Sequence, residues 1–141
     1  MSLYNGIDMA NLNAPKQIVV SGVVDQLDAV EQKAKDAGAQ MAIRLKVSGA
    51  FHSRYMKPLA EEFSSSLSSI DFNTFDKPVI ANVSAKAYSQ ELASDYLLAQ
   101  LYSSVRWVES IKGLIDQGVQ DFVEVGPGRV LKGLLRHIER G

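Results

Sequence analysis

Residues 47–59 read VSGAFHSRYMKPL, and this stretch joins two parts of the chain that carry different patterns. A strand-like apolar run precedes it, and a helical pattern begins after Ser53. His52 is one of two histidines in the chain and lies at this junction, a kind of place where proteins often put binding and catalytic residues. Because histidine exchanges a proton near neutral pH, His52 is a candidate general base. The alternative is a helix-capping or core histidine.

The first part of the chain predicts a β-α-β unit. A β-branched run at residues 18–24 is typical of a strand, whereas residues 1–12 read as irregular. Asp25 is the predicted N-cap of a helix that ends before Gly38. Residues 41–47 carry apolar side chains at every second position, which predicts another strand with one buried face.

The second part of the chain alternates helices and strands. Apolar residues recur at helical spacing between Leu59 and Ile70. The short apolar runs at residues 78–83 and 121–125 are typical of parallel strands that are covered on both faces. Further helices are predicted at residues 91–102, 108–117 and 130–138. The alternation predicts an α/β fold, and a change in composition near residue 53 divides it into subdomains at residues 1–52 and 53–141.

Length and composition exclude several classes of protein. The chain has 141 residues, 46% of them hydrophobic, which is enough for a core. Its formal net charge of −1 provides no field for binding nucleic acid or an anionic membrane. The absence of cysteine excludes disulfides, thiol catalysis and zinc–thiolate sites, and it fits a cytoplasmic location. No apolar run approaches the ~18 residues of a membrane span.

Four blocks of sequence together resemble one enzyme family. They are the Phe-His-Ser stretch with its Met-Lys-Pro continuation, and the segments at residues 11–22, 100–107 and 123–131. Their order and spacing resemble the malonyl-CoA:acyl-carrier-protein transacylases, and the resemblance covers about residues 8–138. It covers only the C-terminal half of such an enzyme. The family's Gly-x-Ser-x-Gly nucleophile elbow and its substrate-binding arginine lie upstream of anything in this sequence.

The resemblance implies a fold and a reaction. Residues 1–52 are expected to be the remainder of a ferredoxin-like subdomain, and residues 53–141 the C-terminal part of an α/β-hydrolase-like parallel sheet with helices. The implied reaction moves a malonyl group from CoA to the phosphopantetheine thiol of acyl carrier protein through a seryl intermediate, in fatty-acid or polyketide synthesis. The implied partners are malonyl-CoA and acyl carrier protein, and no metal or other cofactor is expected.

The resemblance also implies roles for individual residues. His52 matches the general base, and Gln100 matches the residue whose backbone carbonyl orients the imidazole. Phe51 matches a position whose ring disfavours an α-methyl branch, although one methyl group is worth only ~1–3 kcal/mol of discrimination. A plain core role for Phe51, and an exposed helical position for Gln100, are the alternatives.

Three amides are further candidates for substrate binding. Asn11 and Gln17 match positions near the acyl pocket, and Asn82 follows an apolar strand at the end where ligands bind in open α/β sheets. Ordinary turn or capping chemistry is the alternative for all three. The glycines at 126 and 128 predict a tight turn rather than a phosphate loop, because the third glycine of that motif is absent. A basic set near the C-terminus predicts either a solvated helix end or a docking face for carrier protein, and comprises Arg129, Lys132, Arg136 and Arg140.

The missing nucleophile leads to two expectations for the isolated chain. The first is that it should transfer malonyl groups negligibly. The alternative to an enzyme fragment is a different class of protein, a non-catalytic module that binds CoA or carrier protein. Half a sheet should also expose apolar faces and strand edges. We therefore expect a homodimer, or pairing with a complementing upstream half, rather than a monomer.

Overall fold

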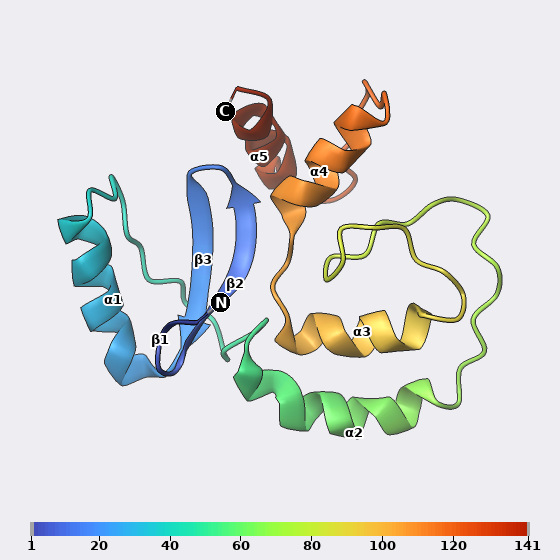
Figure 1. Ribbon diagram of the computed structural model, residues 1–141, viewed down its shortest axis with the longest axis horizontal. Coiled ribbons are helices and arrows are strands. Elements are labelled where there is room, and N and C mark those ends of the chain that lie inside the picture. Colours follow the sequence, from blue (N-terminus) through green and yellow to red (C-terminus); the bar gives the residue numbers. More distant parts are fainter. Residues whose placement is uncertain (1, 141) are drawn as a thin grey trace.

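The chain begins with a three-stranded antiparallel sheet in the order β1-β2-β3. The computed structural model describes residues 2–140, and the strands are Ser2–Tyr4, Ile7–Ala14 and Gln17–Gly22. β2 and β3 form a hairpin with a two-residue turn, in which Ala14 pairs with Gln17 (Figure 1). The expectation that residues 1–12 are irregular is wrong for residues 2–12, which form β1, a turn and most of β2, and residue 1 lies outside the described residues. The residues of β2 have low β-propensity, so the sequence does not indicate a strand there. Pairing with β3 nevertheless satisfies the backbone N–H and C=O groups of β2.

The helix α1, Val24–Asp36, follows β3 directly. It ends before Gly38, whose φ of 89° is the left-handed conformation expected of a glycine after a helix. The predicted N-cap is wrong, because Val23 occupies that position and makes no side-chain cap, while Asp25 lies in the first turn. α1 contains no buried residue.

The predicted strand at residues 41–47 is absent, so the β-α-β unit does not form. Its alternate residues Met41, Ile43, Leu45 and Val47 are between 56% and 72% exposed. A strand requires a neighbouring strand to satisfy its backbone N–H and C=O groups, and none of the described residues pairs with this segment.

Two helices lie side by side after His52 (Figure 1). A short 3₁₀ turn, η1 (Arg54–Met56), leads into α2, Lys57–Leu67, and α3 is Ala93–Tyr102. Pro58 lies in the first turn of α2, where its missing N–H costs nothing. These helices confirm the helical predictions for both segments.

The connection between α2 and α3 is a long loop in place of the predicted strand at residues 78–83. Ile80 and Ala87 form a single antiparallel bridge, and no neighbouring strand extends it. Aromatic contacts also hold the loop, since the ring of Tyr88 lies 5.9 Å from that of Phe75 and 5.6 Å from that of Tyr96.

The remaining helices are α4, Trp107–Asp116, and α5, Val130–Glu139. Ile111 and Ile138 from these helices pack with Ala14 at the turn of the hairpin and form a small core. The predicted strand at residues 121–125 is absent, and Val123 and Val125 are 84% and 92% exposed. As at residues 41–47, no described strand lies beside this segment to pair with it.

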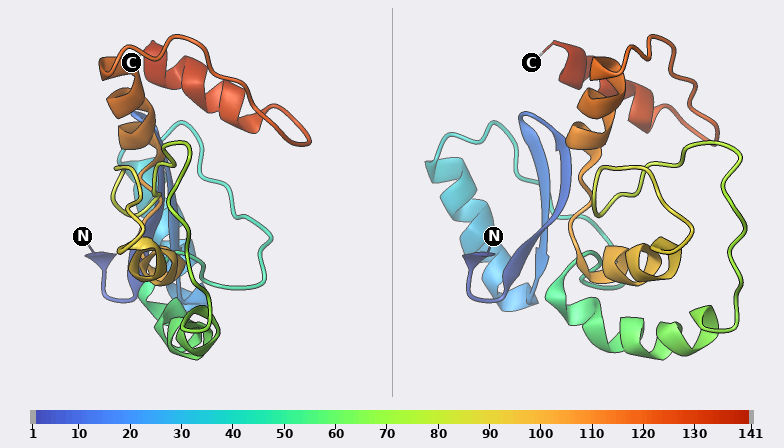
Figure 2. Two further views of the ribbon diagram at one scale, coloured as in Figure 1. Left: turned by 90° about the vertical axis from the view of Figure 1, so that its right-hand side faces the viewer. Right: turned by 45° about the vertical axis from the view of Figure 1, so that its right-hand side comes forward.

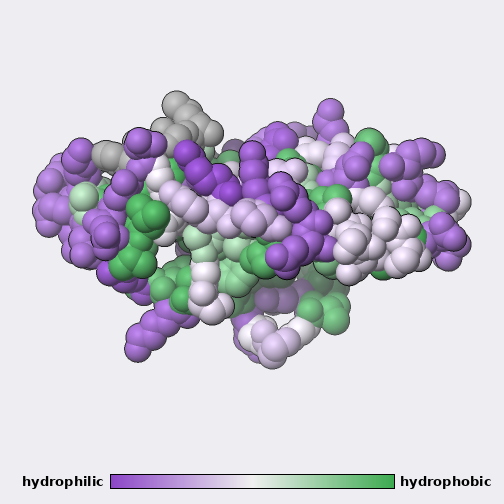
Figure 3. Space-filling view, turned by 90° about the horizontal axis from the view of Figure 1, so that it is seen from below, coloured by the Kyte–Doolittle hydropathy of each residue, from purple (hydrophilic) through white to green (hydrophobic). Residues whose placement is uncertain are grey.

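These elements make an α/β structure whose described sheet, within residues 2–22, is antiparallel. The parallel sheet expected of residues 53–141 is not formed among the described residues. The elements form a thin layer from which α5 and the loop after α1 project to one side (Figure 2, left). Seen from the side of α2, hydrophobic surface is exposed among hydrophilic side chains (Figure 3). Within residues 2–140, no helix has the length and apolar character needed to cross a membrane.

Candidate active site

His52 is fixed in an unusual backbone conformation at the end of the loop before η1. Its φ of 57° is in the left-handed region, which costs a non-glycine residue about 1–3 kcal/mol. Two contacts with the end of α3 hold it there. The backbone N–H of His52 donates to the carbonyl of Leu101 at 3.1 Å, and the ring nitrogen Nδ1 lies 2.7 Å from the carbonyl oxygen of Gln100.

The position of these carbonyls in α3 explains why they are free to accept. α3 ends at Tyr102, and the last four carbonyls of a helix have no partner within the helix. Gln100 and Leu101 are in this last turn, and Ser103 leaves the helix with an extended backbone. His52 therefore satisfies two carbonyls that the helix cannot satisfy itself.

The same contact decides which ring nitrogen can act as a base. A backbone carbonyl only accepts hydrogen bonds, so Nδ1 must carry the proton and the neutral ring has its lone pair on Nε2. Nε2 has no hydrogen-bond partner among residues 2–140.

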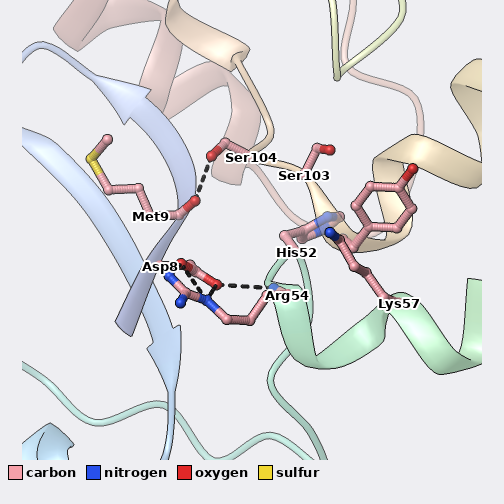
Figure 4. Close-up of a pocket in the computed structure, with 8 residues that line it drawn as sticks. Asp8, Met9, His52, Arg54, Lys57, Ser103 and Ser104 are labelled. Atoms are coloured by element: carbon pink, nitrogen blue, oxygen red, sulfur yellow. Dashed lines mark hydrogen bonds and ion pairs between the residues drawn. The ribbon is translucent and has the colours of Figure 1, made fainter. Parts of the chain in front are cut away.

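His52 lines an open cavity of about 500 Å³ between the sheet and the two neighbouring helices. Figure 4 shows side chains from β2, from η1 and the start of α2, and from the end of α3 converging on it. The lining residues are Asp8, Met9, His52, Arg54, Lys57, Tyr102, Ser103 and Ser104. Segments that are about 50 residues apart in the sequence therefore share one site.

An ion pair closes one side of the cavity (Figure 4). The carboxylate of Asp8 accepts from Nε of Arg54 at 2.9 Å and 3.1 Å, and from the backbone N–H of Arg54 at 2.9 Å. The side-chain hydrogen bond from Arg54 holds the pKa of Asp8 below its usual value. On another side, the Nζ of Lys57 lies 5.7 Å from the centre of the Tyr102 ring, within the range of a cation–π contact.

Of the predicted site residues, only His52 lines the cavity, and Gln100 contacts its ring from outside the lining. His52 and Gln100 are in contact, whereas Phe51 is 46% exposed and does not line the cavity. Asn11 is in β2 and bridges Val105 through its backbone. Asn82 accepts a hydrogen bond from the N–H of Arg106 at 2.9 Å through its backbone carbonyl.

Gln17 lies at the other end of the hairpin from the ion pair. It is exposed and pairs with Ala14, which is six residues from Asp8 along β2, or about 20 Å at the usual strand rise. The sequence interpretation also overlooked Asp8 and Arg54. The arginine directly follows the histidine motif, but its acidic partner is 46 residues away in a segment that was expected to be irregular.

The ring of His52 is held by the end of a helix and lies beside an open cavity. This arrangement suits a general base in acyl transfer. The chain belongs to the acyl transferase family, because the pattern defined as "Acyl transferase domain" matches residues 3–138. Within that family it is similar to malonyl CoA-acyl carrier protein transacylases. It is 46% identical over 137 residues to the one from Bacillus subtilis and 43% identical over 135 residues to those from Staphylococcus aureus.

Solved structures agree with these relatives. An acyl carrier protein S-malonyltransferase from Vibrio cholerae matches 99% of this chain with a TM-score of 0.93 and 37% identity. The Coxiella burnetii transacylase also matches 99% of this chain, with a TM-score of 0.94 and 35% identity. The match covers 43% of the Bacillus subtilis relative, and 46% and 44% of the two solved chains, so this chain spans less than half of their length.

Proposed function

We propose that this chain is the C-terminal portion of a malonyl-CoA:acyl-carrier-protein S-malonyltransferase of fatty-acid or polyketide synthesis, with His52 as its general base. The observation that carries the proposal is the contact of 2.7 Å between Nδ1 of His52 and the Gln100 carbonyl, which leaves Nε2 as the free base. The names of the relatives support the choice of substrates. One similar structure is described as a type II PKS acyl-carrier protein in complex with its malonyl-transacylase.

In the first half-reaction, Nε2 of His52 accepts the proton of a serine hydroxyl while the serine oxygen attacks the thioester carbonyl of malonyl-CoA. The Gly-x-Ser-x-Gly motif that would provide this serine does not occur in the 141 residues, so the serine belongs to a segment outside them. The cationic ring then gives its proton to the CoA sulfur as the carbon–sulfur bond breaks. The products are a malonyl-serine ester and free CoA.

In the second half-reaction, Nε2 accepts the proton of the phosphopantetheine thiol, and the sulfur attacks the ester carbonyl. The carbon–oxygen bond of the ester breaks, and the ring returns the proton to the serine oxygen. Throughout both steps, Nδ1 continues to donate to Gln100, so the ring keeps its orientation while Nε2 cycles between neutral and cationic forms.

The exposed apolar segments support a further part of this proposal. Residues 41–47 and 121–125 carry strand-like patterns, yet neither pairs with a described strand. In the whole enzyme, strands of the upstream half pair with them and complete a ferredoxin-like subdomain, residues 1–52, and a hydrolase-like parallel sheet, residues 53–141. The isolated chain then covers these faces by dimerising or by binding that half. A single monomeric species in light scattering, with a sharp thermal transition, would contradict this.

The predicted substrate-binding residues keep their proposed roles at the acyl pocket, which the upstream half completes. Phe51 is next to His52 and 46% exposed, so its ring is free to meet an acyl group and to disfavour a methyl branch. Asn11, Gln17 and Asn82 provide amides that bind substrate or orient loops. The reaction takes place in the cytoplasm, which fits a chain without cysteine, and uses no metal or other cofactor.

A chimaera tests the function. The matching 43% of the Bacillus subtilis relative is replaced by this chain, which is 46% identical to it. We expect the chimaera to transfer radiolabelled malonyl groups from CoA to acyl carrier protein, and the isolated chain to acquire no label. A chimaera that folds but transfers nothing would overturn the proposal, as would stable labelling of the isolated chain at a serine. Heat released when malonyl-CoA is titrated into the isolated chain would favour the non-catalytic binding module instead.

A further inference from the structure

The ion pair between Asp8 and Arg54 differs from the other long-range ion pair of residues 2–140. The Asp8 side chain is only 19% exposed, and its carboxylate binds both the guanidinium and the backbone N–H of Arg54. Asp28, which pairs with Arg44 through one contact of 3.0 Å, is 78% exposed. Exposed ion pairs contribute little to stability, whereas a partly buried and multiply bonded pair can fix the geometry of a loop.

The pair closes a ring of contacts that contains His52. Arg54 follows His52 by two residues and ties this turn to β2 through Asp8. His52 binds the end of α3 through the Gln100 and Leu101 carbonyls. The chain after α3 returns to β2, where the hydroxyl of Ser104 donates to the Met9 carbonyl at 2.5 Å, and Val105 exchanges hydrogen bonds of 2.8 Å and 2.9 Å with Ala10 and Leu12.

We propose that Asp8 and Arg54 are positioning residues, which act through the backbone of the turn to hold the His52 ring against the Gln100 carbonyl. The strained φ of 57° persists only where the surroundings determine it from several sides. Removing the ion pair frees one anchor of the turn, while the Tyr55 hydroxyl still donates to the Gly6 carbonyl at 3.2 Å. His52 can then relax toward an ordinary backbone conformation, and its ring leaves the carbonyl.

The role in catalysis rests on the proposed function, but the structural effect does not. Displacing a catalytic group by about 1 Å can cost about 100-fold in rate. In the chimaera, we therefore expect Asp8→Asn or Arg54→Ala to lower kcat by about 10- to 100-fold. Since both residues are proposed to act on His52 through the backbone of the turn, the loss should fall mainly on kcat, and KM for malonyl-CoA should change less. The kcat of Arg54→Lys should lie between those of Arg54→Ala and the unsubstituted chimaera, because lysine keeps the charge but loses the forked geometry of arginine.

Nuclear magnetic resonance of the ¹⁵N-labelled 141-residue chain tests the structural effect directly. Long-range ¹H–¹⁵N spectra distinguish the two neutral tautomers of each ring, and His137, which is exposed on α5, serves as an internal control. We expect His52 to be the Nδ1–H tautomer in the wild type. In Asp8→Asn and Arg54→Ala it should become a mixture of tautomers, while His137 stays unchanged. Asp28→Asn makes the same chemical change in the exposed pair and should leave His52 as in the wild type.

The outcomes separate the positioning role from the proposed reaction. An unchanged His52 tautomer in a folded Asp8→Asn or Arg54→Ala variant would overturn the inference, as would an equal effect of Asp28→Asn. If circular dichroism shows that Asp8→Asn does not fold, the Arg54→Ala variant provides the test. It leaves β2 unaltered, and the Arg54 side chain is 43% exposed. If the chimaera has no activity while the tautomer responds as expected, the proposed function fails and the positioning role stands.

Discussion

Replacing Gly22 with alanine should destabilise the chain, although the usual effect of such a change at this kind of backbone would be the opposite. Gly22 ends β3 opposite Ile7, and its φ is not in the left-handed region. On conformational entropy alone, Gly→Ala at a compatible position stabilises by about 0.4–1 kcal/mol, because the unfolded chain becomes less free. For Gly22→Ala, steric contacts decide whether the free energy of unfolding rises or falls.

The added Cβ would overlap the carbonyl oxygen of Gly6 and lie 2.6 Å from Cδ1 and 3.1 Å from Cα of Ile7. The first of these atoms is backbone, and Ile7 is completely buried, so neither can yield cheaply. Overpacking of this kind typically costs about 1–3 kcal/mol. The cost exceeds the entropic gain, and we expect Gly22→Ala to lower the free energy of unfolding by about 1–2 kcal/mol.

Urea denaturation followed by the fluorescence of Trp107, the single tryptophan, measures this change. Gly113→Ala is the matched control, since Gly113 lies inside α4 and an added Cβ there meets no atom within 4 Å. That variant should be more stable by about 0.5–1 kcal/mol. A Gly22→Ala variant as stable as the wild type, beside a stabilised Gly113→Ala, would refute the close approach of β3 to the turn before β2.

Two further predictions concern charged side chains. Because Arg54 lowers the pKa of Asp8 from its ordinary value of 3.8, the stabilising effect of the pair should be complete above about pH 4 and be lost as the pH falls through the lowered value. Acid unfolding should therefore be less steep in Asp8→Asn than in the wild type. The Glu124 carboxylate accepts from the N–H groups of Leu131 and Lys132 at 3.1 Å and 2.9 Å, so Glu124→Ala should cost about 1 kcal/mol in urea denaturation and speed hydrogen exchange in α5. Unchanged exchange in α5 would argue against this cap.

The helices were predictable from the sequence because their signals are local. Apolar spacing and the glycines at 38 and 118 place the ends of α1 and α4 within about two residues. The segments at residues 41–47, 78–83 and 121–125 also carry strand patterns, but a pattern does not provide the neighbouring strand that a ladder requires. Strand formation depends on partners that the segment's own pattern does not provide. Among the described residues, the segments at 41–47 and 121–125 have no such partner, and residues 78–83 have only the single bridge between Ile80 and Ala87.

The site was predictable only in part, for the same physical reason. The contact of His52 with Gln100 was expected from resemblance alone. Every residue has a backbone carbonyl, so the residue type at position 100 does not indicate this role. The ion pair of Asp8 with Arg54 joins positions 46 residues apart, one of them in a strand of low β-propensity. A motif identifies the residue that reacts. The residues that hold it in place can be identified only from tertiary contacts, which the sequence pattern does not show.

The most direct test of the account is the rate of malonyl transfer by the chimaera when His52 is replaced by alanine. Loss of a general base should lower kcat by about 10²–10⁴-fold, while His137→Ala, the same change at the other histidine, should leave kcat unchanged. Circular dichroism establishes that both variants fold. Transfer by the His52→Ala chimaera within a few-fold of the unsubstituted chimaera would contradict the claim that His52 is the base of this reaction.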